Sequence, residues 1–109
     1  MTGLDFGITQ KTFLLLLKTF QSFSEIEEAI LFGSRAMGNY KKGSDVDLVI
    51  KGERVTPRLG LQINAILNER LLIPYFVDVL VYSQIDNPDL LGHVQRVGKV
   101  IYEKSTETT

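Results

Sequence analysis

The chain has 109 residues and a net charge of -1, with 44% hydrophobic and 23% charged residues. This length and balance favour one folded domain with its own core and exclude an intrinsically disordered protein. The lack of a net basic charge argues against a free-standing polymerase, which must grip a nucleic-acid duplex. The absence of cysteine excludes disulfides and thiolate metal sites, and the apolar runs are too short to span a bilayer, so we expect a cytoplasmic protein.

The first predicted elements are a helix and a buried strand. Thr9 is suited to cap a helix of about 14 residues, because apolar residues recur at helical spacing over 13–20. We expect residues 1–8 to form a loose lead-in and residues 22–28 a solvated polar turn. The apolar run 30–32 predicts a strand that is covered on both faces.

A Gly-Ser step, Gly33-Ser34, ends this strand and opens one short helical turn. Its backbone N–H groups can hold a phosphate, and Arg35 in the same turn is the best candidate for a side-chain phosphate contact. Gly38 suits a helix stop at positive φ, and Gly43 suits a tight turn into the next strand. A Gly-Ser step alone is a common turn, so the prediction of phosphate binding depends on the residues that follow.

Two aspartates, Asp45 and Asp47, open the next predicted strand. Because side chains alternate along a strand, both carboxylates project from one face while Val46 and Leu48 point to the other. Two carboxylates about 4 Å apart repel by roughly 4 kcal/mol at an effective dielectric near 20. Such a pair is tolerated if one acid is protonated or a cation neutralises it, and oxygen ligands favour Mg²⁺ or Mn²⁺ over zinc. Aspartate is also common at strand starts, which explains Asp45 better than Asp47.

Two helices and two strands are predicted in the second half of the chain. A capping threonine followed by proline predicts a helix over 56–71, and the apolar segment 75–82 predicts a third strand. An Asp-Asn-Pro cap predicts a last helix over 86–98, and 100–102 suit a short strand or core packing. We expect a single domain over residues 1–104 and a disordered polar tail over 105–109.

Asp78 is a lone acid within the third predicted strand, with Val77 and Val79 on the opposite face. A charge in mid-strand is costly unless it is paired or bound to a metal. From the residues alone, a functional acid and a salt-bridged structural acid explain Asp78 equally well. His93, the only histidine, is expected to be a surface or packing residue of the last helix.

The motif G-S-R-A-x-G at 33–38, followed by S-D-V-D-L at 44–48, resembles the signature of the minimal nucleotidyltransferases, which share the polymerase-beta catalytic fold. The resemblance covers nearly the whole chain and implies an α/β domain, a small mixed β-sheet of three or four strands flanked by helices. It implies nucleotide binding and metal-dependent catalysis by two groups of residues. The nucleotide-binding group is Gly33, Ser34, Arg35 and Ser44, and the catalytic, metal-binding acids are Asp45, Asp47 and Asp78.

The resemblance also implies a reaction and a partner. The reaction is the Mg²⁺- or Mn²⁺-dependent transfer of AMP from ATP, a nucleoside triphosphate, to a hydroxyl group. Members of this family are commonly antitoxins, which implies a helical HEPN-type RNase toxin as partner and a toxin tyrosine as acceptor. We expect no direct binding to nucleic acid or membrane, and homo-oligomerisation stays open.

Two alternatives remain at the level of the sequence. The first is a non-catalytic module that neutralises its partner by contact, because Met37 stands where many relatives carry a basic residue. The second is transfer of AMP to a small molecule such as an aminoglycoside, for which homodimerisation would have to build the acceptor pocket. The sequence leaves the acceptor, the base preference and the oligomeric state undetermined.

Overall fold

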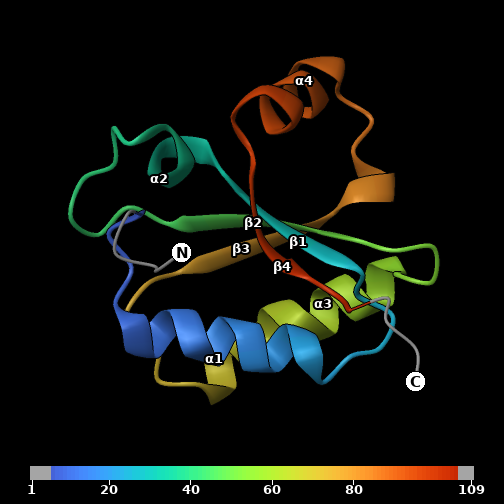
Figure 1. Ribbon diagram of the computed structural model, residues 1–109, viewed down its shortest axis with the longest axis horizontal. Coiled ribbons are helices and arrows are strands. Elements are labelled where there is room, and N and C mark those ends of the chain that lie inside the picture. Colours follow the sequence, from blue (N-terminus) through green and yellow to red (C-terminus); the bar gives the residue numbers. More distant parts are fainter. Residues whose placement is uncertain (1–5, 106–109) are drawn as a thin grey trace.

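A computed structural model describes residues 6–105 as a mixed β-sheet with helices on both faces (Figure 1). The sheet has four strands in the order β3-β2-β1-β4. They are β1 (Glu28–Phe32), β2 (Val46–Lys51), β3 (Val77–Val81) and β4 (Lys99–Glu103). β2 runs antiparallel to β1 and parallel to β3, and β4 runs antiparallel to β1. This arrangement confirms the predicted α/β class with a small mixed sheet.

The helices begin close to their predicted capping residues. They are α1 (Gln10–Gln21), α2 (Gly33–Met37), α3 (Pro57–Ala65) and α4 (Pro88–Val97), with a π-helical turn (Ile66–Arg70) that continues α3. The side chains of Thr9, Thr56 and Asn87 each accept a hydrogen bond from a backbone N–H of the first turn. No helix within residues 6–105 has both the length and the apolar character that a membrane span requires.

The sheet separates two apolar layers, with α1 and α3 on one face and α4 on the other (Figure 1). Ala29 and Leu31 of β1 point into the larger layer, while Ile30 and Phe32 pack in the layer that contains Val94 of α4. Successive side chains of a strand point to opposite faces, so a strand covered on both faces is apolar at every position. The prediction from the run 30–32 is therefore confirmed.

The prediction of a loose segment before α1 is wrong for residues 6–8. Phe6 and Ile8 are only 5% and 1% exposed and belong to the larger core layer. Two apolar residues around a glycine give too short a pattern to predict burial, which here comes from packing against the rest of the fold. Residues 1–5 of the predicted lead-in, and the predicted tail apart from Ser105, lie outside the described residues.

Candidate active site

The topology brings the Gly-Ser bend and two of the predicted acids to one end of the sheet. In the parallel pair of β2 and β3, Asp47 lies directly opposite Asp78. In the antiparallel pair of β1 and β2, Asp47 lies opposite Phe32, the residue before Gly33. Residues that lie directly opposite each other project to the same face, so both carboxylates lie on the α4 side of the sheet.

The carboxylate of Asp47 interacts electrostatically with both of the other predicted acids. Its pKa is raised above the ordinary value by burial first, then by the negative charges of Asp78 and Asp45, while His93 acts in the opposite direction. Asp45 precedes β2 and is exposed, whereas Asp47 and Asp78 are half-buried. Asp78 and Asp45 therefore both disfavour the ionisation of Asp47.

These acids supply only oxygen ligands, the set that Mg²⁺ and Mn²⁺ prefer. A divalent cation would relieve the repulsion that raises the pKa of Asp47, so the donor set fits such an ion. Within residues 6–105, no three histidine, aspartate or glutamate side chains already converge as a metal site.

Gly33 packs directly against the acid of β2. Its φ is +76°, and a Cβ added at this position would overlap the Oδ2 atom of Asp47. Both the left-handed backbone and the close approach exclude a side chain here. The N–H of Gly33 donates a hydrogen bond to Nε2 of His93 at 3.3 Å. The predicted phosphate-binding bend and the predicted metal ligands are thus in contact.

Of the two predicted nucleotide-binding serines, Ser34 lies in α2 and Ser44 lies in the loop between α2 and β2. The carbonyl of Ser34 accepts from the N–H groups of Gly38 and Asn39, at 2.9 and 3.2 Å, and so closes the end of α2. The hydroxyl of Ser44 accepts from the N–H of Lys41 at 2.8 Å. The described hydrogen bonds of both residues therefore shape the loop itself.

Arg35 has a different environment from the one expected of a phosphate ligand. Its side chain is 1% exposed, and Nη1 donates to the carbonyl of Phe6 at 2.8 Å. Nε and Nη2 donate to the carbonyl of Ser44 at 3.1 and 2.8 Å. The guanidinium carbon also lies 5.1 Å from the ring centroid of Tyr40 and 4.7 Å from that of Tyr75. This placement does not fit the expected phosphate contact. It indicates a structural role, in which Arg35 ties the segment before α1 to the loop before β2, and we call this set of contacts the Arg35 latch.

His93 lies beside the acids, although the sequence pattern favoured a surface or packing role. Besides its bond to Gly33, its ring meets that of Phe32 edge-on, with centroids 6.1 Å apart. It reaches this position because α4 packs on the face of the sheet from which Asp47 projects. The available signal was weak, namely a single histidine on a helix whose partner strand was unknown.

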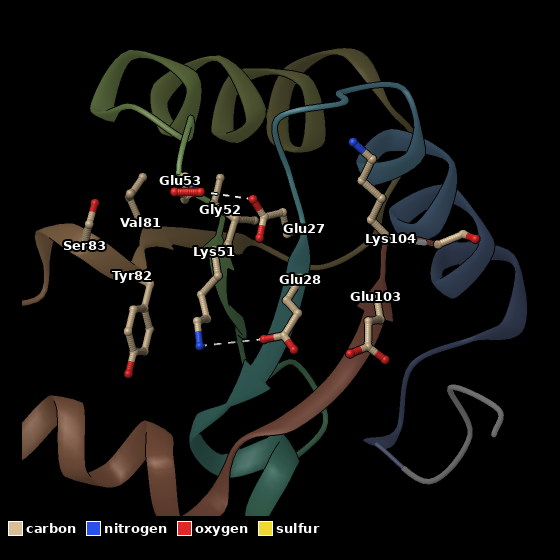
Figure 2. A pocket seen from close by; sticks show the side chains of 12 residues that line it. Glu27, Glu28, Lys51, Gly52, Glu53, Val81, Tyr82, Ser83, Glu103 and Lys104 are labelled. Atoms are coloured by element: carbon tan, nitrogen blue, oxygen red, sulfur yellow. Dashed lines mark hydrogen bonds and ion pairs between the residues drawn. The ribbon is translucent and has the colours of Figure 1, made fainter. Parts of the chain in front are cut away.

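A cavity of about 710 Å³ lies at the opposite end of β2 from the acids. Figure 2 shows a row of side chains across it, in which Lys51 lies between Tyr82 and Glu28. The Lys51 ammonium is 3.8 Å from the Glu28 carboxylate and 4.4 Å from the Tyr82 ring centroid. No predicted site residue lines this cavity, so its size does not identify it as the site of phosphate chemistry.

Comparison with known proteins identifies the family and the fold of the chain. Residues 16–107 match the family model described as polymerase beta nucleotidyltransferase. The fold is similar to a chain of a toxin–antitoxin complex crystallised with AMP-PNP, with a TM-score of 0.69 and 18% identity over 84% of this chain and 73% of that chain. It is also similar to a chain in the structure of a tri-AMPylated Shewanella oneidensis HEPN toxin in complex with an MNT antitoxin. The TM-score is 0.65 and the identity 16%, over 87% of this chain and 72% of that chain. No curated protein matches the sequence.

At these identities, the structural similarity establishes a shared fold. The family model adds a match in sequence that spans residues 16–107, most of the chain. The chain therefore belongs to the polymerase beta nucleotidyltransferase family.

Proposed function

We propose that this protein transfers AMP from ATP to a hydroxyl group with the help of a divalent cation. The observation that carries this proposal is the alignment of Asp47 with Asp78 across two parallel strands, with Gly33 packed against Asp47. A bend whose backbone N–H groups open a helix beside clustered carboxylates suits a ligand that combines phosphates with a metal ion, and the N–H of Gly33 would exchange its bond to His93 for a phosphate oxygen.

Each residue of the site has a role in this proposal. Asp45, Asp47 and Asp78 would hold Mg²⁺ or Mn²⁺, which when bound neutralises charge on the triphosphate. The backbone N–H groups of Gly33 and Ser34 bind phosphate oxygens and orient the α-phosphorus. Asp78 takes the proton of the acceptor hydroxyl as its oxygen bonds to that phosphorus. The bond from the α-phosphorus to the bridging oxygen of the β-phosphate breaks, and pyrophosphate leaves.

The proposed acceptor is a tyrosine of a helical HEPN-type toxin, which makes this protein an antitoxin. The support comes from structural neighbours, one crystallised with AMP-PNP and one a complex in which a HEPN toxin is AMPylated. A second candidate is a binding module without transfer activity. It is favoured by Met37, which is 49% exposed in α2 and brings no positive charge to the phosphates.

Labelled ATP separates the two candidates. The protein is incubated with Mg²⁺, a candidate HEPN-type toxin such as the product of an adjacent reading frame, and ATP labelled at either the α- or the γ-phosphate. Transfer predicts that the α-label moves to the toxin and the γ-label leaves in pyrophosphate, and that a Tyr→Phe change in the toxin removes the signal. A stable complex without label would identify a binding module. Label on an added aminoglycoside, with an unmodified toxin, would identify a small-molecule acceptor.

Gly33→Ala is expected to abolish most of the transfer activity. The left-handed backbone costs about 1–2 kcal/mol for alanine, and the new Cβ displaces the carboxylate of Asp47. Gly38→Ala is the matched control, because Gly38 has a φ of +84° but no atom within 4 Å of an added Cβ. Thermal unfolding should show similar losses for both variants. Equal transfer rates in the two variants would contradict the proposed contact with Asp47.

A further inference from the structure

Two asparagines of the helical segment after β2 bind the outer edge of β3. The side-chain amide of Asn64 donates to the carbonyl of Val79 at 2.9 Å and accepts from its N–H at 3.0 Å. The amide of Asn68 does the same with Val77, donating at 2.7 Å and accepting at 2.9 Å. Each amide thus makes the reciprocal pair of hydrogen bonds that a neighbouring strand would make. We call Asn64 and Asn68 the asparagine pair.

The spacing of the asparagine pair matches the spacing of the strand. Four residues along a helix advance about 6 Å, and two residues along a strand advance about 6.6 Å. The second N–H of each amide is also used, because Asn64 donates to the carbonyl of Gly60 at 3.1 Å and Asn68 to that of Asn64 at 3.0 Å. Both amides are therefore fixed in orientation, as a precise contact requires.

The residue between the two bound positions of β3 is Asp78. Val77 and Val79 bond outward to the asparagine pair, while Asp78 lies opposite Asp47 of β2. β3 is an edge strand of the sheet, so β2 is its only neighbouring strand in the described part of the chain. Without the asparagine pair, the backbone on either side of Asp78 would be held from one side alone.

We propose that Asn64 and Asn68 are positioning residues that hold Asp78 in place against Asp47 for metal binding and transfer. This inference rests on the function proposed above. A displacement of about 1 Å at a reacting group can cost roughly 100-fold in rate. An edge strand tied on both sides of the acid by helix side chains limits such displacement, because α3 and its π-helical turn are themselves anchored in the core through Leu59, Ile63 and Leu67.

The test compares wild type with the double variant Asn64→Leu/Asn68→Leu, which removes the bonds at similar volume and without a change in charge. We expect Mn²⁺, measured by electron paramagnetic resonance, to bind at least tenfold more weakly, close to the affinity of an Asp78→Asn reference. The maximal transfer rate should fall roughly 10- to 100-fold. Amide exchange at Val77 and Val79 should accelerate, because these N–H groups lose their acceptors.

Thr56→Ala serves as the control for stability. It removes the cap of α3, which costs about 1 kcal/mol, and leaves the asparagine pair intact. A purely structural role predicts that Thr56→Ala and the asparagine variants change Mn²⁺ affinity alike, in proportion to their stability. If the double variant does not fold, the single variants Asn64→Leu and Asn68→Leu take its place.

The outcomes separate this inference from the proposed function. Folded asparagine variants with wild-type Mn²⁺ affinity and transfer rate would overturn the positioning role while the proposed function stands. Wild-type protein that binds Mn²⁺ but transfers no label would overturn the proposed reaction, and the difference in Mn²⁺ affinity between wild type and variants would still decide the role of the pair. Wild-type protein that binds no Mn²⁺ would overturn both.

Discussion

Asp47→Asn is expected to lower the rate of AMP transfer by roughly 10³-fold, because a metal ligand of this kind contributes several kcal/mol to charge stabilisation. Asp47 is the acid that faces both Gly33 and Asp78, so its loss affects the phosphate bend and the metal site together. The substitution keeps the size of the side chain, and far-UV circular dichroism should show an unchanged fold. The α-labelled ATP assay measures the rate.

The same substitution is expected to raise stability at neutral pH in the absence of divalent cations. The pKa of Asp47 is raised in the folded protein by burial and by Asp78 and Asp45. Wild type therefore loses stability as the pH rises through this folded-state pKa, since the unfolded chain holds the charge in water. Asparagine never ionises, so the variant should unfold at higher temperature at pH 7. This advantage should vanish below about pH 3.9, where the carboxyl is protonated in both states.

Asp86→Asn is the control for the effect on transfer, because Asp86 is an exposed aspartate in the loop before α4. It should leave the transfer rate unchanged. Full transfer activity in the Asp47 variant would remove this residue from the metal site. A lower unfolding temperature at pH 7 would show that the Asp47 carboxylate is stabilised by contacts other than those described.

Arg35→Met is expected to lower the free energy of unfolding by roughly 3–5 kcal/mol. The change leaves the carbonyls of Phe6 and Ser44 without their donor, at about 1–3 kcal/mol each for a buried group, and ends the contacts with two tyrosine rings. Denaturant unfolding at equilibrium measures the loss. Arg35→Lys should recover only part of the lost stability, since one ammonium cannot reproduce the several N–H donors of the planar guanidinium group.

Arg58→Met is the matched control, because Arg58 is exposed at the start of α3. Its free energy of unfolding should stay within about 0.5 kcal/mol of the wild-type value. The informative contrary result is an Arg35 variant that unfolds like wild type but no longer binds ATP. That result would restore the interpretation of Arg35 as a phosphate ligand and would reject the latch.

Local chemistry explains which parts of this fold could be predicted. Thr9 and Thr56 cap their helices as expected, because capping depends on residues within one turn of each other. The alternation of side chains along a strand predicted that Asp47 and Asp78 each project to the face opposite their apolar neighbours. Their alignment across β2 and β3 came from the resemblance to a known family, since a single sequence carries no register between strands that a helix separates.

The features that the sequence did not reveal are contacts between distant segments. Arg35 was interpreted from its place in a turn, but its acceptor on Phe6 lies 29 residues away in the sequence. The asparagine pair reads as part of the polar side of a helix until the edge of β3 is placed beside it. In each case the side-chain type was informative, and only the tertiary arrangement shows which backbone group it binds.

The closed edge of β3 has a consequence for assembly. The asparagine pair occupies the outward N–H and carbonyl groups of Val77 and Val79, whereas no side-chain amide among residues 6–105 bonds to the backbone of β4 in this way. A protein that docks by extending the sheet would therefore meet fewer occupied backbone groups at Lys99–Glu103, on the far side from Asp78. Such a companion would leave the acids uncovered, so that a separate hydroxyl donor could enter while it stays bound.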